Sequence, residues 1–267
     1  MASYPVTTEI ALEHSPGWLT VWLDRPQVRN ALSETMASEL RAVAETARSD
    51  TALRGLTLRG RGGVFCAGAD IKRFASILEG NATIADVAAY SRHAGELFHL
   101  INELPQVVVA LVEGAALAGG LGLACAADVV AATEDARFAL TETMIGIPPA
   151  QIAPFIVQRI GPAAARRIML TGTRLDVTAA RELGLVDFVA ADADGLATIE
   201  AEVRRGVMAC APGANAATKE IILAMRKLEG RAMIDFAADR FAACMLGDEG
   251  REGTTAFFEK RKPRWAQ

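Results

Sequence analysis

Cysteine and histidine are scarce in this chain of 267 residues, and their spacing excludes several kinds of site. The four cysteines stand at least 34 residues apart, so no C-x-x-C pair is available for a zinc ribbon or a thioredoxin-type motif. The three histidines, His14, His93 and His99, are too few and too scattered to form a metal cage. We therefore expect no metal site.

Long apolar runs and a positive charge excess are also missing. The longest uncharged apolar stretch, residues 114–127, is too short to span a bilayer and contains four glycines. Lys and Arg number 28 against 32 Asp and Glu, whereas nucleic-acid-binding proteins usually carry a basic excess. Residues 1–4 lack the features of a signal peptide. We therefore expect no nucleic-acid partner, no membrane segment and a reducing, cytoplasmic location.

The remaining composition is that of a globular protein, with 51% hydrophobic and 22% charged residues. At this length, folding buries roughly 70–75% of the surface of the unfolded chain. Ser33 is expected to cap a helix that runs from Glu34 to about Arg48. Apolar runs bounded by turn residues predict strands at residues 18–23, 54–59, 107–112 and 128–132. From residue 154 onward the pattern is helical, so we expect an α/β core followed by a helical C-terminal module.

Two strand-to-helix turns are unusually rich in small residues. They read Phe65-Cys-Ala-Gly-Ala-Asp-Ile-Lys72 and Glu113-Gly-Ala-Ala-Leu-Ala-Gly-Gly-Leu-Gly122. Small residues let a ligand approach the main chain, and the unpaired amides of a helix N-terminus carry the positive end of its dipole. Two such turns together can polarise one carbonyl oxygen. For either turn taken alone, tight packing of helix against sheet is the better explanation, and neither turn contains a Rossmann or Walker motif.

Together the two turns resemble the enoyl-CoA hydratase/isomerase (crotonase) superfamily. Further matching segments, in the same order, are Asp24-Arg-Pro-Gln-Val-Arg-Asn-Ala-Leu32, Phe138-Ala-Leu-Thr-Glu142 and the stretch 251–262. The resemblance implies a crotonase-like spiral core of ββα turns at residues 1–195 and a helical trimerisation module at residues 196–267. It also implies a homotrimer or homohexamer and an acyl-CoA thioester substrate. Coenzyme A is then part of the substrate, with no separate cofactor.

The resemblance also implies roles for particular residues. The backbone N–H groups of Ala69 and Gly119 are expected to form an oxyanion hole that stabilises the thioester enolate. Glu142 is the expected proton carrier, and its apolar neighbours predict a raised pKa. Contacts with the substrate and its coenzyme A are implied for Arg29, Ala67, Asp70, Ile71 and Gly122, and for Phe257 and Lys260 of a neighbouring subunit.

Gly122 departs from the family pattern, because hydratases of this family carry a second glutamate at that position. The stretch 144–155 is similar to methylglutaconyl-CoA and isohexenylglutaconyl-CoA hydratases. The leading hypothesis is therefore a hydro-lyase that adds water to a branched or carboxylated enoyl-CoA, with the space at Gly122 left open for the acyl group. Two alternatives remain, a Δ3-Δ2 enoyl-CoA isomerase that uses Glu142 alone and a crotonase that binds acyl-CoA without turnover.

Overall fold

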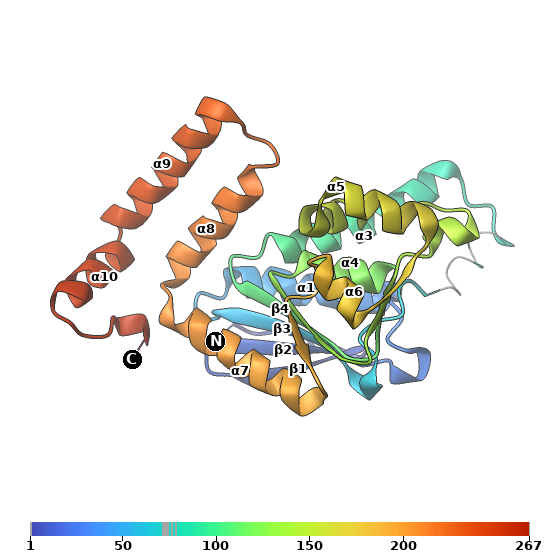
Figure 1. The fold of residues 1–267 in the computed structure, drawn as a ribbon, viewed down its shortest axis with the longest axis horizontal. Coiled ribbons are helices and arrows are strands. Elements are labelled where there is room, and N and C mark those ends of the chain that lie inside the picture. Colours follow the sequence, from blue (N-terminus) through green and yellow to red (C-terminus); the bar gives the residue numbers. More distant parts are fainter. Residues whose placement is uncertain (1, 71–74, 76, 78, 267) are drawn as a thin grey trace.

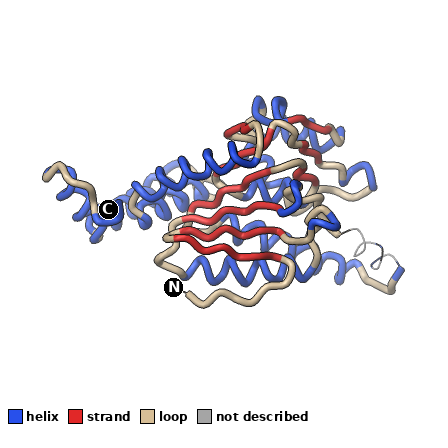
Figure 2. The backbone as a smooth tube through the Cα atoms, turned by 90° about the horizontal axis from the view of Figure 1, so that it is seen from below, coloured by secondary structure: helices blue, strands red, loops and turns tan. Residues whose placement is uncertain are grey.

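A six-stranded sheet forms the centre of the molecule in this computed structural model, which describes residues 2–70, 75, 77 and 79–266 (Figure 2). The strand order is β1-β2-β3-β4-β6-β9, in which β1 runs antiparallel to β2 and the other neighbours are parallel. The strands are β1 (Ile10–Ser15), β2 (Trp18–Leu23), β3 (Gly55–Gly60), β4 (Val107–Val112), β6 (Val129–Thr133) and β9 (Phe188–Ala190). The strands predicted at residues 18–23 and 107–112 are confirmed, and β3 and β6 begin one residue later than predicted.

A smaller three-stranded sheet stands beside the first. Its order is β5-β7-β8, with β5 (Ala115–Leu117) parallel to β7 (Arg137–Ala139) and β8 (Arg174–Asp176) antiparallel to β7. Strands β1, β5, β7, β8 and β9 were not predicted. Four of these have three residues each, which is too short for alternation to distinguish a strand from a loop.

Helices cover both faces of the large sheet (Figure 1). The structure describes these helices: α1 (Glu34–Ser49), α3 (Ile84–Asn102), α4 (Gly119–Ala126), α5 (Ala153–Thr171), α6 (Val177–Glu182), α7 (Ala193–Ala209), α8 (Pro212–Ala224), α9 (Gly230–Leu246) and α10 (Asp248–Phe258). The predicted cap of α1 is confirmed, because the Ser33 hydroxyl accepts a hydrogen bond from the Met36 N–H at 3.0 Å. Short 3-10 turns lie at Pro26–Val28, Arg61–Gly63, Glu142–Ile145 and Arg264–Ala266.

Strand β4 is buried on both faces, as its continuous apolar sequence predicts. Val108, Ala110 and Val112 belong to the main core, together with apolar residues of α1, α3 and α4. Val109 and Leu111 pack on the opposite face, in a second cluster that includes Leu196 of α7. Two helical layers therefore enclose the sheet.

Helix α7 belongs to the body of the molecule, although the predicted boundary between residues 195 and 196 falls inside it. Its Glu200 accepts a hydrogen bond from the Thr57 hydroxyl of β3 at 2.6 Å, and Thr57 in turn accepts one from the Trp18 indole at 2.8 Å. Helices α8, α9 and α10 extend away from the sheet (Figure 1). We therefore propose that the helical module begins at α8. In the described part of the chain, no helix is both long and apolar enough to cross a membrane.

Candidate active site

Three parallel segments deliver the predicted catalytic groups to one edge of the small sheet. Cys66 forms a parallel bridge with Ala116 of β5, and Ala116 is paired with Phe138 of β7. Because the three chains run in the same direction, the residues that follow them emerge at the same edge. Ala69 and Gly119 each come three residues after their bridge residue, and Glu142 comes four after Phe138. The register therefore gathers three groups that are far apart in sequence.

The N–H group of Ala69 points away from the neighbouring segment around Leu32, with which residues 68–70 pair. Leu32 forms a parallel bridge with Ala69. The Leu32 N–H donates to the Gly68 carbonyl at 2.8 Å, and the Asp70 N–H donates to the Leu32 carbonyl at 3.0 Å. Since neighbouring peptide groups of an extended chain point in opposite directions, the Ala69 N–H faces the other side.

Gly119 presents the second N–H group, at the first position of α4. Ala118 before it has φ 48° and ψ −122°, an uncommon backbone conformation for a residue with a side chain. A Cβ placed on Gly119 would lie 3.8 Å from the Ala69 nitrogen, so the two amides are neighbours. Among the described residues, neither the Ala69 nor the Gly119 N–H donates a hydrogen bond to the protein. Two adjacent free donors can bind one carbonyl oxygen.

Glu142 opens a 3-10 turn, Glu142–Ile145, directly after β7. Gly146 ends the turn in the left-handed conformation, with φ 82°, and the Thr143 hydroxyl ties the turn to α5 by donating to the Met169 carbonyl at 3.1 Å. The Oε2 atom of Glu142 is buried and, among the described residues, has no hydrogen-bond partner. Burial raises the pKa of the Glu142 carboxyl group, and backbone groups of Glu142 and Thr141 offset part of that rise. The unpartnered oxygen is available to exchange a proton with a ligand.

Comparison with known proteins agrees with this geometry. Residues 13–267 match the model of the family described as enoyl-CoA hydratase/isomerase. The chain belongs to the enoyl-CoA hydratase/isomerase family. It is therefore a member of a family of lyases and isomerases that act on acyl-CoA thioesters.

Solved structures and curated sequences from this family cover almost the whole chain. Pseudomonas aeruginosa AtuE is 49% identical, with a TM-score of 0.94 over 97% of this chain and 100% of that one. An enoyl-CoA hydratase/isomerase from Marinobacter aquaeolei is 40% identical, with a TM-score of 0.93 over 97% of this chain and 99% of that one. A putative enoyl-CoA hydratase of Thermus thermophilus is 36% identical over 248 residues, 92% of this chain and 96% of the relative. The crotonase fold is thereby confirmed.

The other residues predicted around the first turn are held by the loop that precedes α1. Ala67 donates its N–H to the Arg29 carbonyl at 3.0 Å, and the Arg29 side chain is exposed to solvent. The Asp70 carboxylate forms an ion pair with Arg25 at 3.1 Å. Ile71 lies outside the described residues. Contacts of these side chains with coenzyme A stay predictions.

Phe257 and Lys260 lie at the other end of the molecule. Figure 1 shows α10 far from the segment around residue 70, so the fold does not bring these two residues to the active site of their own chain. Phe257 is 80% exposed. Their position is compatible with the expectation that they serve the site of a neighbouring subunit.

The space expected beside Gly122 is occupied, and that part of the prediction is wrong. A Cβ on Gly122 would overlap the Ile152 Cγ2 atom and lie only 2.6 Å from the Ile152 Cβ. Ile152, which precedes α5, is 4% exposed. The position of the second glutamate in ordinary hydratases is thus filled by an apolar side chain, not left open for substrate.

Sequence reasoning missed three residues that shape the site: Arg25, Leu32 and Ile152. Arg25 and Leu32 lie inside the matched segment 24–32, which was a signal that they matter. Ile152 lies inside the stretch 144–155, but nothing in that stretch indicated its contact with Gly122, 30 positions earlier in the chain.

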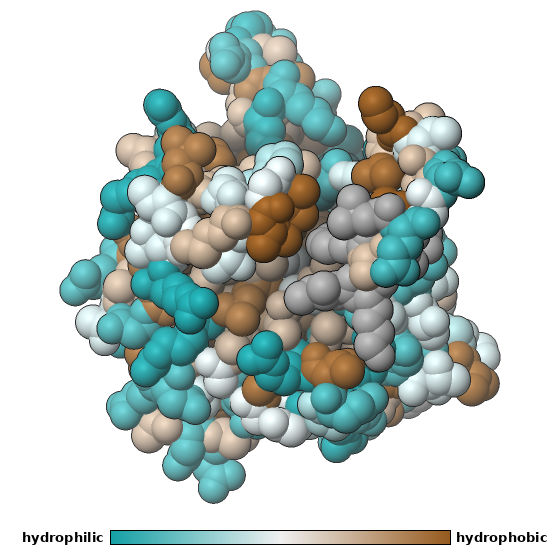
Figure 3. Space-filling view, turned by 90° about the vertical axis from the view of Figure 1, so that its right-hand side faces the viewer, coloured by the Kyte–Doolittle hydropathy of each residue, from teal (hydrophilic) through white to brown (hydrophobic). Residues whose placement is uncertain are grey.

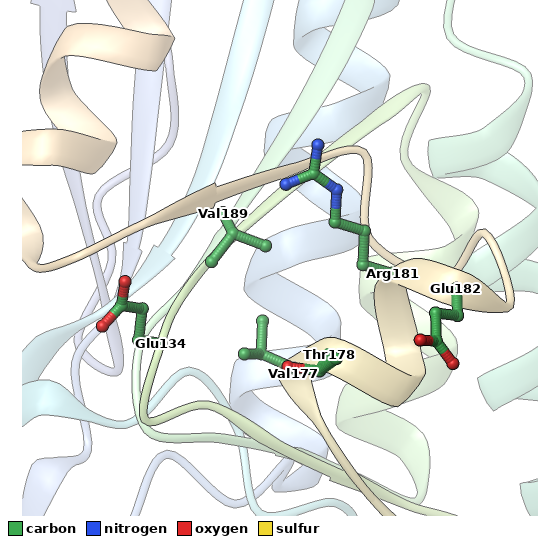
Figure 4. Close-up of a pocket in the computed structure, with 6 residues that line it drawn as sticks. All are labelled: Glu134, Val177, Thr178, Arg181, Glu182 and Val189. Carbon is green, nitrogen blue, oxygen red and sulfur yellow. The ribbon is translucent and has the colours of Figure 1, made fainter.

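The surface around the site includes exposed apolar side chains. Met144 and Ile145 of the Glu142 turn are 63% and 66% exposed. Figure 3 shows apolar side chains beside the residues drawn in grey, on the face at the right of Figure 1. A separate hollow between α6 and β9 includes none of the predicted site residues (Figure 4); it is lined by Glu134, Val177, Thr178, Arg181, Glu182 and Val189.

Proposed function

We propose that this protein adds water across the double bond of a branched or carboxylated enoyl-CoA. The observation that carries the proposal concerns three groups at one sheet edge. They are the buried Oε2 of Glu142 and two adjacent amides, none of which has a hydrogen-bond partner among the described residues. A proton acceptor and an oxyanion hole are the two groups that hydration of an enoyl thioester requires.

One carboxyl group suffices for the proton transfers. The Glu142 carboxylate takes a proton from water as the water oxygen bonds to the β-carbon. The double-bond electrons move to the thioester oxygen, where the N–H groups of Ala69 and Gly119 stabilise the enolate. The Glu142 carboxyl group then returns the proton to the α-carbon, which restores the carbonyl and leaves the enzyme unchanged.

The proposal of a branched or carboxylated acyl group is based on the surroundings of Gly122, where ordinary hydratases carry the second glutamate. Ile152 covers Gly122 with hydrocarbon, so the described residues place no carboxylate at this position. An apolar wall suits a branched hydrocarbon portion and does not repel an acyl group that bears its own carboxylate. We also propose that the helical module assembles the chain into a homotrimer or homohexamer.

A second candidate activity is Δ3-Δ2 enoyl-CoA isomerisation. The same observation supports it, since a lone Glu142 carboxylate can take a proton from one carbon and return it to another. Hydration consumes water and removes the conjugated double bond, whereas isomerisation creates conjugation without changing the mass.

The test is a turnover assay on straight-chain, branched and carboxylated enoyl-CoAs, with products resolved by mass and Glu142→Gln as the inactive control. We expect loss of the ultraviolet absorbance of conjugated enoyl-CoAs and a product heavier by one water, fastest with branched or carboxylated chains. Faster hydration of straight chains would refute the proposed acyl group. A gain of absorbance from unconjugated substrates, with no water added, would replace hydration by isomerisation.

A further inference from the structure

We propose that Arg25 is a positioning residue for the oxyanion hole, which it serves by holding Asp70 and the Ala31 carbonyl so that the Ala69 N–H keeps its direction. The inference rests on the proposed role of the Ala69 amide, but not on the choice of acyl group or on hydration as the reaction.

The Arg25 guanidinium joins two chain segments. Its Nη1 donates to the Ala31 carbonyl at 2.7 Å, on the loop before α1. Its Nη1 and Nη2 both donate to Asp70 Oδ2, at 3.2 and 3.1 Å, on the segment that carries the oxyanion amide. Asp70 directly follows Ala69. Arg25 therefore fastens the residue next to the catalytic amide to the neighbouring chain.

The two segments that Arg25 joins also form a short backbone ribbon. Three hydrogen bonds connect them: Ala67 N–H to the Arg29 carbonyl, Leu32 N–H to the Gly68 carbonyl, and Asp70 N–H to the Leu32 carbonyl. These bonds leave the Ala69 N–H facing away from the ribbon. The Asp70 bond is the last of the three, and the Arg25 side chain reinforces this end.

Glu9 and Asn30 hold Arg25 itself in place. Its Nε lies 3.2 Å from Glu9 Oε1, and the other oxygen of Glu9 accepts a hydrogen bond from the Met36 N–H, in the first turn of α1. Its backbone N–H donates to the Oδ1 of Asn30, a fully buried side chain whose Nδ2 donates to the Val64 carbonyl at 2.6 Å. Because these contacts fix Arg25, its guanidinium group can in turn hold the Asp70 side chain in place.

The ion pair between Arg25 and Asp70 is partly buried, so we expect its loss to change the position of Asp70. The Arg25 and Asp70 side chains are 16% and 18% exposed. Removal of the guanidinium leaves the partly buried carboxylate without this cation, and the carboxylate gains by turning toward water. Because Asp70 directly follows Ala69 in the chain, that movement shifts the Ala69 backbone and changes the direction of its N–H group. A misplacement of about 1 Å in a catalytic arrangement costs up to about 100-fold in rate.

The experiment combines kinetics with infrared spectroscopy of bound isovaleryl-CoA, isotopically labelled at the thioester carbonyl. This saturated ligand has no double bond to react, so its carbonyl stretching frequency reports only polarisation in the oxyanion hole. For Arg25→Met we expect a frequency closer to that of free isovaleryl-CoA. We also expect kcat on an enoyl-CoA substrate to fall by about 10- to 100-fold with KM nearly unchanged.

Arg204→Met is the matched control, because Arg204 also has several partners but lies on α7, on the other side of the sheet. It stacks on the Trp18 ring at 5.1 Å and reaches the Ser15 hydroxyl. We expect it to lower the melting temperature without changing the carbonyl frequency. If Arg25→Met does not fold, Arg25→Lys and Asp70→Asn carry the same test, since each retains part of the hydrogen bonding. The proposal is overturned if the folded Arg25 or Asp70 variants keep the wild-type carbonyl frequency and kcat.

Discussion

Burial gives the Glu142 carboxyl group a pKa above the usual glutamate range. A base must be unprotonated to accept a proton, so a raised pKa moves the acidic loss of activity to higher pH. We expect kcat/KM to fall, as pH is lowered, through an apparent pKa above the ordinary glutamate value of about 4.3. A pH profile of the initial rates measures this. An acidic limb at or below the ordinary value would contradict the assignment of Glu142 as the base.

The same shift has a consequence for stability. A carboxyl group whose pKa is raised in the folded state favours folding when protonated, and this contribution is lost as pH rises through the folded-state pKa. Glu142→Gln cannot ionise. Thermal melts should therefore show the Gln variant gaining stability relative to the wild type as pH rises from below 4 to 8.

The Glu142→Gln variant should also lose at least about 100-fold in turnover, the low end of general acid–base effects. The amide keeps the shape of the side chain but cannot carry the proton. Calorimetric titration with isovaleryl-CoA serves as the control and should show binding close to that of the wild type. Near-normal turnover in this variant would remove Glu142 from the mechanism.

At the scale of an element, α4 is defined by its packing against the N-terminal end of α5. Gly122 lies against Ile152, and an added methyl group meets buried atoms. We expect Gly122→Ala to lower the free energy of unfolding by about 1–3 kcal/mol, as overpacking in a core does. In the Gly122→Ala, Ile152→Ala double variant, the loss should be smaller than the sum of the two single losses. Chemical denaturation of all four proteins measures this coupling.

Gly206 on α7 is the matched control, because it is an exposed helical glycine. In the described part of the chain, no atom outside the adjacent helix backbone lies within 4 Å of a Cβ added there. Gly206→Ala should raise the free energy of unfolding by up to about 1 kcal/mol, the difference in helix propensity. If Gly122→Ala is equally stabilising, the proposed collision with Ile152 does not occur in solution.

The contrast between β4 and β7 shows which elements were predictable. Val107–Val112 is an unbroken apolar run, and such a run favours a strand covered on both faces. The three-residue strand β7 has no pattern of its own and exists because β5 and β8 pair with it. The helical pattern predicted from residue 154 onward is confirmed in α5, where Gly161, with φ 74° and ψ 163°, is non-helical and separates two helical segments.

At the scale of the whole molecule, α8, α9 and α10 leave many apolar side chains uncovered. Those at least half exposed are Ile222, Met225, Ile234, Phe241, Met245, Leu246, Phe257 and Phe258. Such a surface is typical of an interface with another protein. Within the chain, α8 is anchored to the body by Lys219, whose Nζ lies 2.5 Å from Asp128 and donates to the Gln106 carbonyl at 2.7 Å. The exposed apolar side chains therefore lie on a group of helices, α8 to α10, whose first helix is fixed to the body of the protein.

We expect the protein to run as a trimer or hexamer in light scattering after size exclusion, and Phe241→Asp to lower the molar mass toward the 28.2 kDa of one chain. Phe241 is 69% exposed on α9, and a carboxylate there opposes burial in an interface. Asp239→Ser, two residues away and also exposed, is the control and should leave the assembly intact. A monomeric wild type would refute the assembly.

Lys260 is considered at the same scale, because it follows α10, a helix that lies far from the active site of its own chain (Figure 1). If a neighbouring subunit supplies it to the coenzyme A phosphates, Lys260→Ala should raise KM and weaken the salt dependence of KM, with little change in kcat. Steady-state kinetics at several ionic strengths measures both effects. A fall in kcat at constant KM would contradict a role limited to holding the coenzyme.

By itself, the amino-acid sequence determined the class of fold, the family resemblance and the identity of Glu142, Ala69 and Gly119 as candidates. These depend on local patterns: apolar periodicity, small residues after strands, and motifs in a set order. Only the tertiary structure decided that Ile152 packs against Gly122 and that Arg25 forms an ion pair with Asp70. Both depend on contacts between residues 30 or more positions apart, and such contacts are set by strand register and helix packing, which no local pattern encodes.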